Sequence, residues 1–154
     1  MALRYAIDTN VLLRLSHRNH PHHNLIAESM RRLALLDIDL CFTPQNLGEF
    51  WNVSTRPVDR NGFGLSVEET RRRFKTAVAA MTLLPENKAV FQKWEHLLLE
   101  HEVRGVQVHD AHLAATLEVH GVRHLLTFNE ADFKRFPRII PVHPLLIESS
   151  RKIT

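Results

Sequence analysis

The stretch YAIDTNVLL, residues 5–13, places one acid between two apolar runs near the start of the chain. The residues before Asp8 predict a short buried strand, and those after Asn10 predict a helix. An unpaired carboxylate is costly inside a core, so Asp8 needs a structural partner or a ligand. Asp is also a favoured residue at the start of a helix, where its oxygen accepts a backbone N–H. The two roles are compatible, because a capping carboxylate keeps free lone pairs.

The whole chain, at 154 residues, is the size of one domain. It has no apolar run of membrane-spanning length and no secretory signal at its start, so we expect a cytoplasmic protein with no membrane partner. The single cysteine, Cys41, argues against an internal disulfide or a multi-cysteine zinc site, and its apolar neighbours favour a buried thiol. The net charge of +3 permits a nucleic-acid partner without arguing for one.

Apolar strands alternate with amphipathic helices along the chain. Strands are predicted at residues 3–7, 38–43, 83–85, 122–128 and 138–142. Helices are predicted from Asp8 or Thr9, at 24–36, from Pro44 to before Pro57, from Ser66 to Met81, at 87–103 and at 108–120. This alternation is typical of an α/β fold, with a central parallel sheet of four to five short strands and helices on both faces. We expect residues 1–147 to form the domain and residues 148–154 a short tail.

Acidic and polar side chains gather where the predicted strands end. Ligands of parallel sheets bind beyond the carboxyl ends of the strands, where the strand order reverses. The residues expected to meet there are Asp8, Glu49, Asp110, Thr127, Asn129 and Asp132. Carboxylates held together raise one another's pKa, and a cation between them relieves that cost. Oxygen donors favour a hard ion, Mg²⁺ or Mn²⁺, and such ions serve the hydrolysis of phosphodiesters.

The same segments resemble those of a known family. The chain resembles PIN-domain proteins, which include the VapC-like ribonuclease toxins of bacterial toxin–antitoxin pairs. The matching pieces are IDTNVLL at 7–13, QNLGEFWNVSTRP at 45–57, VHDAHLAATLEVHGVRHLLTFNEADF at 108–133 and a closing short strand. This resemblance implies a single PIN-like domain that cleaves RNA with Mg²⁺ or Mn²⁺, and a small antitoxin protein as a partner.

The resemblance also implies roles for individual residues. The implied metal ligands are Asp8, Glu49 and Asp110, and the implied supporting residues are Asn10 and Thr127. The chain departs from the family at Asn129, where many members have Asp. Asp132 is the nearest substitute for that acid. An Asn oxygen can ligate a metal but brings no charge, so a second ion would be held less firmly.

Each of these residues has an interpretation without a metal. Asp8 and Asp110 could each cap a helix. Glu49 could face solvent at the edge of an apolar helix, Asp132 could be an ordinary surface acid, and Thr127 could be a strand-end hydroxyl. Of these, the burial of Glu49 is the most informative observation.

Basic residues supply candidates for substrate contact. We expect Arg14, Arg56 and Arg60 to contact phosphate, whereas the arginines at 71–73 spread around a helix and favour a solvated face. The loop HRNHPHHN, residues 17–24, is rich in histidine but matches no standard zinc spacing. If the fold places this loop beside the crevice, we expect it to contact the substrate.

These observations predict a metal-dependent ribonuclease of the VapC-like type, with Asp8, Glu49, Asp110 and Asp132 as catalytic residues. RNA rather than DNA follows from the resemblance alone. One alternative is a domain of the same fold that binds nucleic acid or protein without cutting, and the missing fourth acid keeps it open. Another is a phosphatase-like enzyme that acts on a small phosphate ester.

The predicted helices carry more apolar surface than one sheet covers. The segments VLLRL at 11–15 and LLLE at 97–100 are apolar over more than one stripe. Surplus apolar surface usually marks an interface, and a two-fold dimer is the commonest solution. Together with the resemblance, this predicts a homodimer formed through the first two helices.

Overall fold

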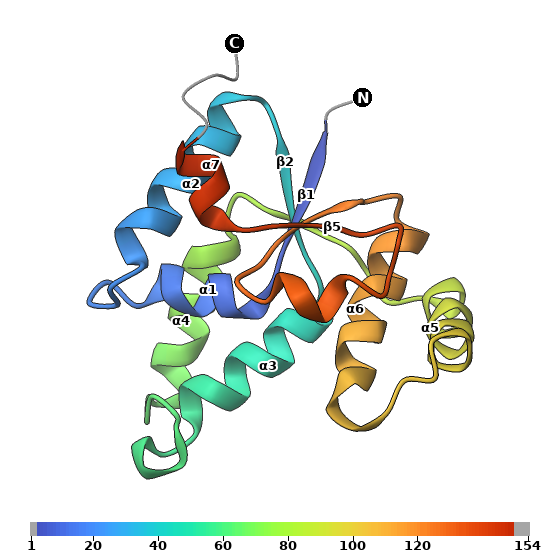
Figure 1. Ribbon diagram of the computed structural model, residues 1–154. Helices are drawn as coiled ribbons and strands as arrows, with labels where there is room; N and C mark the ends of the chain where they lie inside the picture. Colours follow the sequence, from blue (N-terminus) through green and yellow to red (C-terminus); the bar gives the residue numbers. More distant parts are fainter. Residues whose placement is uncertain (1–2, 150–154) are drawn as a thin grey trace.

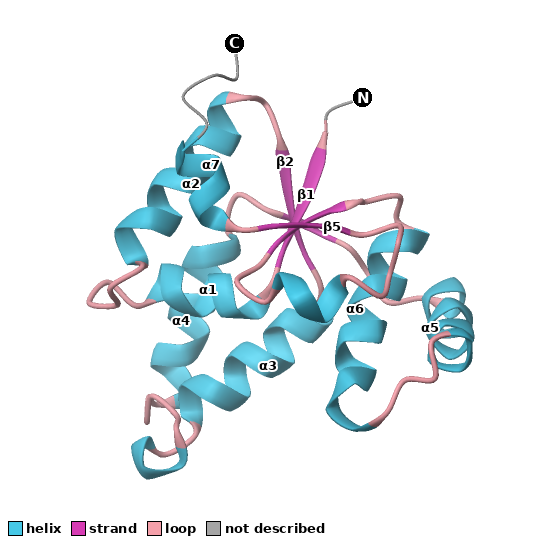
Figure 2. Cartoon of the chain, viewed as in Figure 1, coloured by secondary structure: helices cyan, strands magenta, loops and turns pink. Residues whose placement is uncertain are grey.

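A computed structural model describes residues 3–149, with side chains described through residue 147. Five parallel strands form one sheet in the order β3-β2-β1-β4-β5 (Figures 1 and 2). The strands are β1 (Arg4–Ile7), β2 (Asp39–Phe42), β3 (Thr82–Leu83), β4 (His124–Leu126) and β5 (Ile140–Val142). The helices are α1 (Thr9–Ser16), α2 (His23–Leu35), α3 (Pro44–Thr55), α4 (Val67–Val78), α5 (Lys88–Glu100), α6 (Val108–Val119) and α7 (Pro144–Ser149). The predicted α/β fold is confirmed.

Helices cover both faces of the sheet. Neighbouring residues of a strand point to opposite faces, so strands β1 and β4 each contribute apolar side chains to two separate cores. Ala6 of β1 and Leu125 of β4 belong to the core that α5 and α6 cover. Their neighbours Ile7 and Leu126 belong to the core on the side of α1, α2, α3 and α4. Figure 1 shows the two groups of helices on either side of the sheet.

Local signals fix where most helices begin. The Thr43 hydroxyl accepts from the Asn46 backbone N–H and the Asn46 side chain accepts from the Thr43 N–H, so α3 begins in a capping box. Pro44 occupies the first turn, as predicted. Ser66 caps α4 by accepting from the backbone N–H of Glu69. These two caps could be predicted from the sequence because each depends only on residues that are close together in the chain.

Two predicted helix ends were wrong. The helix predicted to reach Met81 ends at Val78, because a tight turn brings the Met81 N–H back to the Val78 carbonyl before β3 begins. The helix predicted to reach 103 ends at Glu100, because Glu102 takes a left-handed backbone with φ 47°. Helix α7 was not predicted. It packs against α2, and a proline occupies its first position.

The sheet order places a topological switch point at the carboxyl ends of β1 and β4. The chain adds β2 and β3 on one side of β1 and then crosses over to add β4 and β5 on the other, so strand order reverses beside β1. Such a switch point is where parallel sheets bind ligands. The backbone N–H of Asp8 donates to the Leu126 carbonyl over 2.9 Å, which sets the residues after the two strands side by side.

Three short 3₁₀ segments complete the chain: η1 (Val58–Arg60), η2 (Gly105–Gln107) and η3 (Glu130–Phe133). Cys41 is buried, as predicted. Within the described residues, no helix is long and apolar enough to cross a membrane. The predicted tail, residues 148–154, lies outside the part of the chain whose side chains are described, and its boundary stays a prediction.

Candidate active site

Asp8 caps helix α1 and also meets β4. Its Oδ1 accepts from the Thr9 backbone N–H over 2.7 Å, which is the capping contact expected of an acid at this position. Its Oδ2 accepts from the Thr127 hydroxyl over 2.7 Å and more weakly from the Asn10 side-chain amide over 3.4 Å. The capping role considered from the sequence is therefore present, and it leaves lone pairs of the carboxylate available to a ligand.

Thr127 is more than a strand-end hydroxyl, because its hydroxyl group both donates and accepts a hydrogen bond within the site. It is fully buried, and its oxygen accepts from the backbone N–H of Asn129 over 2.9 Å while its hydrogen points to Asp8. The Asn10 side-chain oxygen accepts from the Phe128 backbone N–H over 3.4 Å. The two polar residues expected to support the site thus join the end of β4 to the start of α1.

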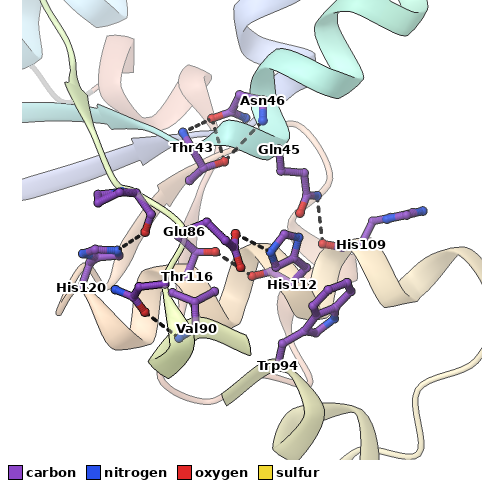
Figure 3. Close-up of polar contacts among 12 residues, drawn as sticks. Thr43, Gln45, Asn46, Glu86, Val90, Trp94, His109, His112, Thr116 and His120 are labelled. Atoms are coloured by element: carbon purple, nitrogen blue, oxygen red, sulfur yellow. Dashed lines mark hydrogen bonds and ion pairs between the residues drawn. The ribbon is translucent and has the colours of Figure 1, made fainter. Parts of the chain in front are cut away.

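Glu49 lies on α3 and is half-buried, so it is not a freely solvated surface acid. The Gln45 side-chain amide donates to Glu49 Oε1 over 2.5 Å and to the His109 carbonyl over 3.0 Å. Figure 3 shows Gln45 reaching from α3 to the backbone of His109 on α6. Gln45 was not singled out from the sequence. Its spacing of four residues from Glu49 is the signal that could have found it.

Asp110 and Asp132 approach the crevice from α6 and from η3. Asp110 does not cap its helix: α6 begins at Val108, with Gln107 at the cap position, and Asp110 lies in the first turn. Asp110 is half-buried, whereas Asp132 is exposed. Asn129 is also exposed, at the start of η3.

Burial and neighbouring negative charges raise the pKa of two of these acids, Asp8 and Asp110. Burial raises the pKa of Asp8 to about 6, against the hydrogen bonds from Thr127 and Thr9, and the nearby charges of Glu49 and Asp132 raise it further. Burial also raises the pKa of Asp110 to about 6, with further contributions from Asp132, Asp8 and Glu49. The structure therefore brings together the four acids that the sequence singled out.

The donor set fits a hard divalent cation, although the side chains do not already form a closed ligand shell. Among the described residues, no three His, Cys, Asp or Glu side chains form a group that could hold a metal ion as placed. Burial and, after it, the charges of neighbouring acids nevertheless raise the pKa of Asp8 and of Asp110, and a cation would relieve both the cost of burial and that repulsion. Mg²⁺ usually keeps several waters and needs only one or two direct carboxylates, so the wider spacing is compatible with it.

The three candidate arginines lie in different places. The Arg14 guanidinium carbon is 3.9 Å from the centroid of the Phe128 ring, which brings Arg14 beside the end of β4. Arg56 lies at the carboxyl end of α3 and donates to the Asn61 carbonyl, and Arg60 is exposed in η1. The loop that holds Arg60 extends from the outer end of α3, away from the sheet (Figure 1). Of the three, only Arg14 has a contact that places it at the end of β4, beside Phe128.

The histidine-rich loop lies beside the same end of β4. His22 stacks on Phe128, with ring centroids 5.3 Å apart and an angle of 16° between the rings. His17 instead meets Phe63 edge-on, and His23 Nδ1 lies 3.3 Å from the Arg14 carbonyl. His20 and His22 also contact each other, with ring centroids 5.3 Å apart. Through His22 the loop reaches the end of β4, and contact with a substrate stays a prediction.

Most of the chain matches a known family. The model of the PIN domain matches residues 5–139. The chain belongs to the PIN-domain family. The resemblance inferred from the sequence is thereby confirmed, and this fold is typical of nucleases. A comparison with curated proteins found no match.

Solved structures of toxin–antitoxin systems share the fold of this PIN domain. VapBC2 from Rickettsia felis, bound to a promoter DNA fragment, matches with a TM-score of 0.70 and 17% identity over 92% of this chain and 98% of that chain. VapC20 from Mycobacterium tuberculosis, described as a toxin that cleaves the sarcin–ricin loop, matches with a TM-score of 0.62 and 15% identity over 86% and 95%. A toxin–antitoxin complex from Klebsiella pneumoniae matches with a TM-score of 0.62 and 19% identity over 91% and 97%.

Proposed function

We propose that this PIN domain is a Mg²⁺- or Mn²⁺-dependent endoribonuclease of the VapC-like toxin type. The observation that carries the proposal is the group of acids at the ends of β1 and β4, where burial, together with the charges of the neighbouring acids, raises the pKa of Asp8 and Asp110 to about 6. Keeping these carboxylates charged at neutral pH costs free energy, which is hard to explain if they serve only to stabilise the fold. A bound cation relieves that cost.

Each residue has a distinct part in this proposal. Asp8, Asp110 and Glu49 would hold the ion: Asp8 from the start of α1, Asp110 from the first turn of α6 and Glu49 from α3. Thr127 fixes the Asp8 carboxylate by donating to Oδ2, so that the remaining lone pairs face the crevice. When bound, the ion supplies activation of water and stabilisation of the leaving oxygen of a phosphodiester. Arg14 is placed to neutralise a neighbouring phosphate.

The choice of RNA as substrate rests on the resemblance to VapC-like ribonucleases and is supported by the fold shared with VapC20, which is described as a toxin that cleaves the sarcin–ricin loop. The test incubates the protein with single-stranded RNA, DNA of the same sequence and p-nitrophenyl phosphate, each with Mn²⁺ and with EDTA. We expect Mn²⁺-dependent cutting of RNA alone. Hydrolysis of p-nitrophenyl phosphate without cutting of RNA would instead support the phosphatase-like alternative.

A second candidate function is binding of nucleic acid or protein without cleavage. The exposed Asn129 favours it, because this residue stands where a fourth acid would add charge to the site. RNA binding that is unchanged by EDTA, with no cleavage in Mn²⁺, would decide for this alternative.

Residues around η3 are expected to tune the affinity for metal. Asn129→Asp should strengthen Mn²⁺ binding, because it adds a full charge beside the proposed ion. Asp132→Ala should weaken binding, but less than Asp110→Asn, because Asp132 is the more exposed of the two. Titration calorimetry with Mn²⁺ compares these proteins with the wild type. If Asp132→Ala binds Mn²⁺ and cuts RNA like the wild type, Asp132 has no part in the site.

Gln45 is expected to act as a positioning residue for Glu49. Gln45→Leu removes the amide that ties Glu49 to α6, and loss of a hydrogen-bonding partner of a metal ligand typically costs about 10- to 100-fold in metal affinity or activity. We therefore expect weaker Mn²⁺ binding by calorimetry at an unchanged melting temperature in EDTA. Gln92→Leu, on the exposed face of α5, is the matched control. Equal affinities in the two variants would contradict the positioning role.

We also propose a small antitoxin protein and a second copy of the chain as partners. The antitoxin is supported by the fold shared with toxin–antitoxin complexes. The dimer is supported by apolar side chains left exposed at the end of α2, where Leu35 is 80% exposed, and on α7.

The dimer is expected in solution at tens of micromolar protein, and Leu35→Lys is expected to weaken it because it would bury a charge at the interface. Light scattering should report twice the chain mass of 17.8 kDa for the wild type. Leu99→Lys, at an exposed position on α5, is the control. A wild-type monomer would contradict the prediction, and equal dissociation of both variants would place the interface elsewhere.

A further inference from the structure

Phe128 carries an aromatic cluster directly beside the acidic crevice. It follows Thr127, whose hydroxyl holds Asp8, and its half-buried ring packs on the core beside α1. Arg14 lies over the ring, with its guanidinium carbon 3.9 Å from the centroid. His143 meets the ring edge-on at 5.1 Å, so that packing from three segments holds the ring in place.

His22 is the exposed member of this cluster. Its ring lies nearly parallel to that of Phe128, at 16° and 5.3 Å, although the residue itself is exposed to solvent. The loop conformation is supported locally, because the His22 backbone N–H donates to His20 Nδ1 over 3.0 Å. His22 is thus an exposed flat ring that packs on the Phe128 ring, which in turn contacts the Arg14 guanidinium. A planar group of a ligand could stack on such a ring.

We propose that His22, backed by Phe128, stacks on a nucleobase of a single-stranded RNA whose phosphate lies at the neighbouring carboxylates. The inference rests on the proposed ribonuclease function and adds the subsite that holds a base. Proteins that bind single strands combine aromatic faces with positive charge, and unstacked bases of RNA loops are recognised in this way. Here Arg14 supplies the charge and His22 an exposed ring, whose other ring contact is His20 at a centroid distance of 5.3 Å. Phe128 directly follows Thr127, the residue that donates to Asp8, so the stack belongs to the same end of β4 as the proposed cleavage site.

The test measures binding of fluorescein-labelled single-stranded RNA of mixed sequence by anisotropy, in EDTA so that nothing is cut. A second oligomer of equal length lacks its bases but keeps the ribose–phosphate backbone. We expect His22→Ala to raise the Kd for the RNA about fivefold or more, the lower end of the effect of one base–aromatic stack. The Kd for the abasic oligomer should be unchanged. His22→Phe should bind RNA within about twofold of the wild type, because it keeps the flat ring.

The matched control is His96→Ala, which removes an exposed histidine from α5 on the opposite face of the sheet. It should leave both Kd values unchanged. An equal effect of His22→Ala on both oligomers, or no effect on either, would overturn the stacking role. So would binding by His22→Phe as weak as that of His22→Ala.

Cleavage by the wild type in Mn²⁺ separates this inference from the function on which it rests. If the wild type cuts RNA but His22→Ala binds it normally, the stacking role fails alone. If base-dependent binding requires His22 but no RNA is cut, the stacking role stands and the nuclease proposal fails. A wild type that binds no RNA in EDTA and cuts none in Mn²⁺ would overturn both.

Discussion

Asp8→Asn is expected to abolish Mn²⁺-dependent cleavage of RNA while leaving the fold intact. Asn can keep the hydrogen bond that caps α1, since Asn and Asp are equally good at this position. It cannot keep the negative charge that holds a cation between Asp8 and Asp110. Loss of a hydrogen-bonding partner already costs about 10- to 100-fold, so loss of the ligand itself should cost at least about 100-fold in activity.

The control for this experiment is a variant that changes an acid outside the proposed site. Asp59→Asn alters an exposed acid in η1 and should cut RNA like the wild type. Glu49→Gln and Asp110→Asn should behave like Asp8→Asn, and calorimetry should show weaker Mn²⁺ binding in all of them. Circular dichroism establishes that each variant is folded. Full activity of a folded Asp8→Asn protein would exclude the proposed site.

The parts of this site that the sequence predicted depend on signals that are local in the chain. Asp8 was found because it interrupts two apolar runs, and the start of α3 because Thr43 and Pro44 stand side by side. The alternation of strands and helices then placed the acids at one edge of the sheet, because all strands of a parallel sheet end there.

The parts that could not be predicted depend on contacts between distant segments. Gln45 bridges to the carbonyl of His109, which is 64 residues away. The sequence predicted that Glu49 and Asp110 meet, but it did not indicate that Gln45 would join their two helices. The stack of His22 on Phe128 likewise needs the loop before α2 to fold over the end of β4. The spacing of Arg56 from Glu49 suggested a phosphate contact, but Arg56 lies at the carboxyl end of α3 and donates to the carbonyl of Asn61.

The metal-free protein is expected to gain stability from Asp8→Asn, and by an amount that depends on pH. The folded-state pKa values of Asp8 and Asp110 lie at about 6, above the ordinary value of 3.8. Below the ordinary pKa both groups are protonated whether the chain is folded or not, and the fold bears no cost from them. As the pH rises toward about 6 the unfolded chain releases these protons first, so this contribution to the free energy of unfolding falls, and it levels off above about 6.

The gain from Asp8→Asn should therefore be near zero at about pH 3 and largest above about pH 6.5, where it reaches about 2–3 kcal/mol for a shift of this size. Urea denaturation in EDTA, at a series of pH values, measures the difference between the variant and the wild type. The comparison cancels the titration of other groups, such as the Glu28 carboxyl, whose pKa is lowered by its hydrogen bonds to Arg32 and Arg31.

Mn²⁺ should reverse the order of stability. A ligand present at about 100 times its Kd stabilises the folded state by about 2.7 kcal/mol, and only the wild type should bind tightly enough to gain this. The ion thus replaces the protons that Asp8 and Asp110 would otherwise retain, and its effect should weaken below about pH 6, where protons compete for the same oxygens. A gain from Asp8→Asn that does not change with pH would show that the carboxylate is not under electrostatic strain. The case for a cation at this crevice would then lose its physical basis.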